Sequence, residues 1–350
     1  MDVDSSPLED LGMKKSLLIT LISLVAIALI SSCASRVLKY EKSEELKNIK
    51  EFDDAVKIVT PEAVPVIQRP PPEPAKNSKK ETKKKKLTAK KRNEKETPER
   101  RQPDIENDEG FAGRRPVVDP IHVGERIVHA VSYFAVNAGT MTLQTQAFAE
   151  VNGKKSYHFR LNINSSPFFS HVYSVDDFVD AMLDFESLIP NVFTLHMRET
   201  NQLRESRAFF DHEANQVTIW ERKVTKESGE EHLKLQWQTA PFAQNVFTAA
   251  FYMRFFKWTV GKKNAFWVAN DKENVIFRAL ALRKEKIVTD VGEFNTIVVK
   301  PEIELPGKFT PVGDIFIWLS DDDRKLILRI ESKIRIGTLV SQIIELDRGT

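Results

Sequence analysis

Apolar and polar residues alternate with a period of two through much of the chain beyond Gly124. The clearest run is residues 157–164, which read Tyr-His-Phe-Arg-Leu-Asn-Ile-Asn. Since successive side chains of a β-strand point to opposite faces, this spacing predicts strands with one buried face. Turn-forming residues separate the runs. The other strand candidates are residues 141–147, 192–198, 207–211, 216–221, 275–283, 296–300, 314–320, 325–331 and 338–346.

Short strands joined by tight turns pair in antiparallel fashion. The sequence therefore predicts a mainly antiparallel, all-β domain over residues 121–350, a curled sheet of barrel-like or sandwich form. Residues 245–255 lack alternation and are apolar nearly all round, which predicts one helix packed against the sheet or capping it. The chain has a single cysteine, so no disulfide can form within it and its stability must come from an apolar core.

That cysteine, Cys33, ends a segment with the order of a secretory signal. Met13-Lys14-Lys15 supplies positive charge, residues 17–30 are apolar, and two serines precede the cysteine. The apolar run is shorter than the roughly 20 residues that a membrane-spanning helix needs. Small residues before a lone cysteine resemble the lipobox of bacterial lipoproteins. We interpret residues 1–33 as a signal peptide, with translation beginning at Met13 because acidic residues precede it.

By this resemblance Cys33 would be lipidated after cleavage, and its acyl chains would anchor the protein to a membrane. Ala34 follows the cysteine in place of the Asp that often retains such lipoproteins at the inner membrane. The expectation is therefore the outer membrane, facing the periplasm, with the inner membrane and the cell surface left open. The alternatives are an unmodified thiol beside a cleavage site and an uncleaved anchor helix.

Residues 34–120 predict a disordered, basic and proline-rich tether. Between Lys76 and Arg101, thirteen basic residues against four glutamates leave +9, so the rest of the chain carries −7 within the overall +2. Such a block cannot bury enough surface to fold. One island, residues 43–59, spaces its apolar residues by three and four, which predicts a short amphipathic helix, either transient or bound to a partner.

The lysine-rich run from Lys83 to Arg92 is suited to attract the phosphates of envelope polyanions. The alternative is a solvated linker that extends by self-repulsion. We expect no nucleic-acid partner, because no aromatic residues interleave with these charges and the predicted compartment is wrong.

Catalytic and metal-binding residue patterns are missing. Asp321, Asp322 and Asp323 lie between two strand candidates, where consecutive carboxylates diverge, and they predict a hairpin turn in preference to a metal site. The seven histidines include no pair at ligand spacing, and the chain has no Gly-x-Ser-x-Gly elbow or phosphate-binding glycine loop. We expect no enzyme activity, metal or cofactor. A catalytic site assembled from distant residues is the alternative.

Aromatic side chains point most clearly to binding. Phe168 and Phe169 follow Pro167 in a predicted loop or short helix, and Phe247 and Phe251 lie in the predicted helix. Core packing is the ordinary role of such residues. The alternative is the lining of an apolar cavity that accepts an acyl chain or another amphiphile. These four phenylalanines are the candidate ligand-binding residues, with Phe168 and Phe169 as a partly exposed apolar surface.

Several short stretches along residues 124–347 match one known family, in the order in which that family has them. They are Gly124-Glu125-Arg126, the stretches 137–140, 210–213, 249–254 and 292–299, and residues 315–324 running into 329–333. Together they resemble the bacterial envelope family known only as domain of unknown function 3108. The resemblance implies a periplasmic β-rich domain with a curved sheet around an apolar interior, similar to domains that carry lipoproteins or lipids. It implies no activity, because the family has none agreed.

The sequence therefore favours a non-catalytic, membrane-anchored lipoprotein that binds an apolar or amphipathic envelope ligand or scaffolds envelope proteins. The alternative is a hydrolase of cell-wall or surface glycan. A cavity without convergent titratable groups would support binding, and two acid–base residues within hydrogen-bond reach in a cleft would support catalysis. A filled core with neither feature would support a structural spacer.

Overall fold

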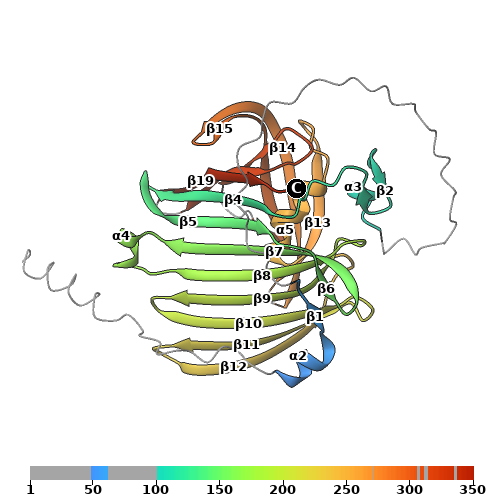
Figure 1. The fold of residues 1–350 in the computed structure, drawn as a ribbon, viewed down its shortest axis with the longest axis vertical. Coiled ribbons are helices and arrows are strands. Elements are labelled where there is room, and N and C mark those ends of the chain that lie inside the picture. The colour runs from blue at the N-terminus through green and yellow to red at the C-terminus, as the bar shows by residue number, and fades with distance from the viewer. Residues whose placement is uncertain (1–48, 62–100, 271, 306–307, 311–313, 335–336) are drawn as a thin grey trace, which may run out of the picture.

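The computed structural model describes residues 49–61, 101–270, 272–305, 308–310, 314–334 and 337–350 (Figure 1). Cys33, the signal segment and the run from Lys83 to Arg92 lie outside the described residues. Within the described ranges, no helix combines the length and the apolar character that crossing a membrane requires.

One large antiparallel sheet forms the body of the domain. Its first half contains β4 (Glu125–Tyr133), β5 (Val136–Thr145), β6 (Ala149–Val151), β7 (Lys154–Ser165), β8 (Asp176–Asp184), β9 (Pro190–Glu199), β10 (Gln202–Asp211), β11 (Gln216–Thr225) and β12 (Gly229–Gln238). Consecutive strands pair throughout this half, except that β5 reaches past the short β6 to pair with β7. The alternation of residues 157–164 thus belongs to β7.

The second half of the sheet contains β13 (Lys263–Asn270), β14 (Glu273–Thr289), β15 (Gly292–Leu305), β16 (Lys308–Thr310), β17 (Asp314–Ser320), β18 (Ile327–Ile334) and β19 (Gly337–Arg348). The last strand, β19, pairs with β4, with Arg348 opposite Glu125. Figure 1 shows β4–β12 as a stack in front, with β13–β15 running across them. The prediction of a curled, mainly antiparallel sheet is confirmed.

The connection from β12 to β13 fills the interior between the two halves. It forms α5 (Val246–Tyr252) and the 3-10 turn η2 (Met253–Phe255). Phe251 stacks on Phe159 of β7 with 3.9 Å between ring centroids, and Tyr252 meets Phe266 of β13 edge to face at 5.0 Å. The helix predicted over residues 245–255 is confirmed, and it packs against both halves of the sheet.

A buried ion cluster fixes this connection to both ends of the domain. Arg254 donates to both carboxylate oxygens of Glu125 at 2.6 and 2.9 Å, and both side chains are almost fully buried. Arg324, in the turn between β17 and β18, donates to the same carboxylate and to the carbonyl oxygen of Arg348. Since buried charges are tolerated only when paired, this cluster constrains how η2, β4 and the chain end meet.

The prediction of one tether over residues 34–120 is wrong for its described stretches. In residues 49–61, α2 (Lys50–Ala55) buries Phe52 against Trp220 of β11, and β1 (Ile58–Val59) pairs with β6. The helix therefore ends before residue 59, because the chain turns there to join the sheet. Its apolar face packs on this chain's own strands, a surface that local spacing could not reveal.

Residues 101–120 are also folded. They contain α3 (Pro103–Glu106) and a small hairpin of β2 (Phe111–Ala112) and β3 (Arg115–Pro116). Ile105 is fully buried in the main core, and Arg115 donates to the Tyr157 hydroxyl at 2.9 Å. Composition places this segment in the tether because it has few aromatic residues, but its charged side chains, such as Arg115, bond to groups of the sheet.

Candidate functional site

The helix that holds Phe168 and Phe169, α4 (Pro167–Ser170), lies between β7 and β8 at one end of the sheet (Figure 1). Pro167 occupies the first turn, where a missing N–H costs nothing, and the Ser166 hydroxyl caps the Phe169 N–H at 3.4 Å. The same hydroxyl donates to the carbonyl oxygen of Asn137 at 2.9 Å. The sequence Ser-Pro thus starts α4 and fastens it to the beginning of β5.

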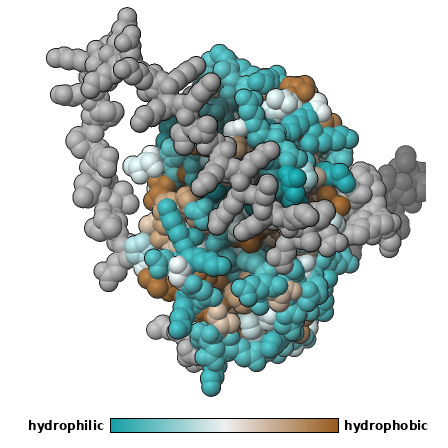
Figure 2. Space-filling model, turned by 90° about the vertical axis from the view of Figure 1, so that its right-hand side faces the viewer, coloured by the Kyte–Doolittle hydropathy of each residue, from teal (hydrophilic) through white to brown (hydrophobic). Residues whose placement is uncertain are grey.

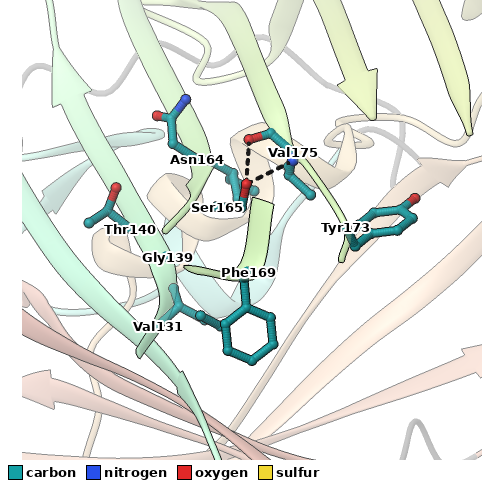
Figure 3. Close-up of a pocket in the computed structure, with 10 residues that line it drawn as sticks. Val131, Gly139, Thr140, Asn164, Ser165, Phe169, Tyr173 and Val175 are labelled. Atoms are coloured by element: carbon teal, nitrogen blue, oxygen red, sulfur yellow. Dashed lines mark hydrogen bonds between the residues drawn. The ribbon is translucent and has the colours of Figure 1, made fainter. Parts of the chain in front are cut away.

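Beside α4 is an apolar cavity of about 220 Å³, the α4 cavity (Figure 3). Its lining comes from β4, β5, β7, α4 and the loop into β8, and consists of Val131, Ala138, Gly139, Thr140, Ile163, Asn164, Ser165, Phe169, Tyr173 and Val175. The Ser165 hydroxyl is occupied, because it accepts from the Val175 N–H at 3.1 Å. The wall therefore offers mainly hydrocarbon to a ligand.

Gly139, one of the residues that line this cavity, lies very close to the neighbouring strand. A Cβ atom at residue 139 would lie 2.1 Å from the carbonyl oxygen of Asn164, which belongs to the backbone of the neighbouring strand β7. No side chain fits at that distance without moving β5 and β7 apart. Glycine at residue 139 therefore permits the close approach of β5 and β7 beside α4.

Exposed apolar side chains occur in the chain segments next to the lining residues of the α4 cavity. Phe168 is 72% exposed, Val172 in the loop after α4 is 76% exposed, and Phe134 in the β4–β5 hairpin is 69% exposed. Large exposed apolar residues that gather at one place mark a contact surface. By contrast, the visible described surface in Figure 2, seen from the right-hand side of Figure 1, is mostly hydrophilic. We call these three side chains, Phe134, Phe168 and Val172, the apolar rim.

Two of the titratable groups at this end have raised pKa values. Burial and a hydrogen bond to Glu199 raise the pKa of Tyr173 to about 12, so its hydroxyl stays protonated and donates to Glu199 at 2.7 Å. Burial also raises the pKa of Asp177 to about 6, although its carboxylate accepts from the Arg198 N–H at 2.9 Å. Both groups already take part in a hydrogen bond, Tyr173 with Glu199 and Asp177 with the Arg198 N–H.

The four predicted phenylalanines do not share one site. Phe169 lines the α4 cavity and Phe168 lies exposed beside it. Phe251 is buried in the core against Phe159, and it lines neither the α4 cavity nor the cavities beside Phe247 and His196. Phe247 lines a second cavity of about 110 Å³ where α5 begins. Cys33 lies outside the described residues. The sequence reading missed Val131 and Val175, because only the pairing of distant strands places them beside Phe169.

One acid–base pair lies in a third cavity, of about 160 Å³. His196 Nδ1 is 3.2 Å from Glu205 Oε1. Arg222 also donates to Glu205 at 3.2 Å, and the His196 ring stacks on Phe178 with 4.9 Å between centroids. Both members of the pair are thus held by neighbours on the sheet.

The predicted acidic turn has the expected form. Asp322 accepts from the Ser320 hydroxyl at 2.6 Å and from the Arg324 and Lys325 N–H groups at 3.0 and 3.1 Å. Asx bonds of this kind hold a turn closed. Across the part of the chain that the structure describes, no three His, Cys, Asp or Glu side chains come together as a metal site would require.

Comparison with known proteins gives one family and several solved structures that are similar to this chain. A family model described as "Protein of unknown function (DUF3108)" matches residues 128–344. No curated protein matches the chain. A β-barrel-like protein with a DUF1849 domain from Brucella abortus is 10% identical, covers 65% of this chain and 98% of its own, and has a TM-score of 0.41.

The other two structures are a candidate lipoprotein from Parabacteroides distasonis and a candidate exported protein with a YmcC-like fold from Bacteroides fragilis. They are 13% and 10% identical, each covers 64% of this chain and 95% or 96% of its own, and both have TM-scores of 0.30. Similarity at this level carries no inference about function.

Proposed function

The chain belongs to the DUF3108 family, whose function is unknown, and from its own contacts we propose that it binds an apolar or amphipathic ligand without catalysis. The ligand's apolar end would enter the α4 cavity and the rest would lie on the rim formed by Phe134, Phe168 and Val172. The observation that carries the proposal is the coincidence of an apolar cavity with exposed apolar side chains at one end of the sheet.

The volume limits what can enter. A cavity of about 150 Å³ lined by apolar side chains is large enough for benzene, whereas sites for drug-sized molecules occupy about 300 Å³ or more. At about 220 Å³ the α4 cavity accepts a short apolar group, such as the end of an acyl chain or one apolar side chain. A longer ligand must therefore continue across the rim, where Phe168 and Val172 are exposed to meet it.

The proposed setting is the cell envelope, with the protein held at a membrane through acylated Cys33. The signal-like order of residues 13–33 supports this, and an amphiphile is the kind of ligand that an envelope supplies. Scaffolding of envelope proteins uses the same apolar rim and remains the other form of the proposal. In that case the α4 cavity would receive an apolar side chain of the partner.

The alternative function, a glycan hydrolase, needs an acid–base site, and the candidate for one is the His196–Glu205 pair in the third cavity. Inverting and retaining glycosidases alike need two carboxyl groups facing the scissile bond. Since Arg222 occupies the second oxygen of Glu205 and Phe178 covers His196, we propose a structural role for the pair. Purified protein should release no soluble sugar from peptidoglycan.

Titration with cis-parinaric acid, a fluorescent fatty acid, tests the binding proposal. The full chain should bind the probe, and Phe168→Ser should weaken binding about tenfold or more, because burying a phenylalanine contributes about 1.5–3 kcal/mol. Val288→Ser is the matched control, since Val288 is 70% exposed on β14 and lines none of the three cavities. Equal affinities for all three proteins would contradict the proposal.

A further inference from the structure

The second cavity, where α5 begins, is lined by Asn245 and Trp237, whose side-chain N–H donors find no acceptor among the residues that the structure describes. We call it the α5 chamber, and it has a volume of about 110 Å³. Its lining residues come from four strands of the first half, from the start of α5 and from β13, and are Phe193, Leu195, Arg204, Ser206, Phe210, Ile219, Trp237, Asn245, Val246, Phe247 and Ala269. None of them lines the α4 cavity, so the two sites are separate.

The first donor is the side-chain amide of Asn245. This residue is 1% exposed, and its Oδ1 accepts from the N–H groups of Phe247 and Thr248 at 2.9 and 2.8 Å. Because these two bonds require an acceptor, the oxygen and nitrogen of the amide cannot exchange positions. Nδ2 must therefore point away from α5. Among the described residues Nδ2 finds no acceptor.

The second donor is the indole N–H of Trp237 on β12, also buried and without an acceptor in the described part of the chain. A buried polar group left unpaired costs about 1–3 kcal/mol. Two such groups on one small cavity therefore favour a ligand atom that accepts hydrogen bonds. Neither Asn245 Nδ2 nor Trp237 Nε1 can accept a bond, so a ligand hydroxyl or amine gains nothing by donating to them.

The charge near the chamber selects a neutral acceptor. Arg204 would attract a carboxylate, but its Nε and Nη2 both donate to Glu221, at 2.7 and 2.6 Å, and the Ser206 hydroxyl donates to the same oxygen. The guanidinium is thus neutralised on the chamber wall. What remains for the ligand is two neutral N–H groups among apolar side chains such as Phe193 and Phe247.

From these contacts we infer that the α5 chamber binds the carbonyl oxygen of an ester or amide attached to an apolar group. The carbonyl accepts from Asn245 Nδ2 and Trp237 Nε1, and the hydrocarbon lies against Phe247 and Ile219. Val246 lines the chamber and is half exposed, so the remainder of the ligand leaves past this residue. A volume of about 110 Å³ suits the ester group and a few carbons, which excludes a whole acyl chain.

Nuclear magnetic resonance of the full chain labelled with ¹⁵N-tryptophan tests this site. The chain has five tryptophans, and the indole signal that disappears in Trp237→Phe identifies Trp237. Methyl butanoate should move that signal downfield in a saturable manner, because its carbonyl accepts the indole proton. Hexane, which has no acceptor, should not. An unmoved signal with methyl butanoate, or the same shift with hexane, would overturn the inference.

Binding strength gives the second readout. Trp237→Phe keeps an aromatic ring and removes one donor, so methyl butanoate should bind about 2- to 10-fold more weakly. Trp220→Phe is the control, because Trp220 packs on Phe52 of α2 and lies outside the chamber. Unchanged affinity in Trp237→Phe would contradict the proposed hydrogen bond. Loss of parinaric acid binding at the α4 cavity would leave this result unaffected, so either proposal can fail alone.

Discussion

Acid should destabilise this domain through the buried imidazole of His129. The side chain is fully buried between β4, β18 and β19, where Nε2 is 2.9 Å from the carbonyl oxygen of Ile327 and Nδ1 is 2.9 Å from the Ser341 hydroxyl. A carbonyl only accepts, so Nε2 carries the proton and Nδ1 accepts from Ser341. Burial disfavours the charged ring and lowers the pKa of His129 from 6.5 to about 4.

The sign and size of the effect follow from this pKa. Between pH 6.5 and 4 the unfolded chain binds a proton that the folded chain refuses, so the free energy of unfolding falls as the pH falls. Each tenfold difference in proton affinity is worth about 1.4 kcal/mol, which gives a loss of about 3 kcal/mol by pH 4. Asp177 acts in the opposite direction, because its raised pKa of about 6 adds stability as the pH falls below that value.

Urea unfolding at pH 7, 5.5 and 4 measures this contribution. His129→Gln is the comparison, since an amide keeps hydrogen bonding at the position and does not titrate. The unchanged protein should lose about 3 kcal/mol more than His129→Gln between pH 7 and 4, and the contribution of Asp177 cancels because both proteins contain it. The same pH dependence in both proteins would refute the reasoning.

Three further substitutions test packing and charge. Gly139→Ala places a Cβ against the Asn164 carbonyl and should cost about 1–3 kcal/mol in urea unfolding; an unaltered midpoint would show that β5 and β7 separate freely. Glu125→Gln leaves Arg254 buried without a full counter-charge and should cost about 3–5 kcal/mol, whereas a loss below 1 kcal/mol would mean that water reaches the cluster. Phe52→Ala should speed amide exchange of residues 49–61 and leave the sheet protected; unchanged exchange would contradict the packing of α2.

The sheet was predictable where each strand has one buried face. Residues 157–164 alternate because β7 turns one face toward the main core, where Tyr157 and Phe159 are buried. Strand β8 was missed because Ala181, Met182 and Leu183 are buried one after another, in three different core clusters, so the strand is covered on both faces. Strand β12 was missed for the opposite reason, since most of its residues are exposed.

The candidate site was predictable only in part. Pro167 and the two phenylalanines after it indicated a bend with apolar side chains, and α4 has both. The cavity itself lies where Gly139 passes the Asn164 carbonyl, a contact set by the register of β5 on β7. The chamber around Phe247 depends likewise on strands far from α5 in the sequence. The spacing of residues along the chain does not predict which strands pair or in which register. It also suggested Phe251 as a ligand-binding residue, whereas this side chain stacks on Phe159 in the core.

Native mass spectrometry of the full chain, purified from membranes of the producing bacteria, tests ligand binding at the α4 end most directly. The protein should carry a reproducible amphiphile mass that is lost in the double variant Phe168→Ser, Phe169→Ser and kept in Val288→Ser. A bare protein mass, or an adduct that the double variant retains, would contradict the account.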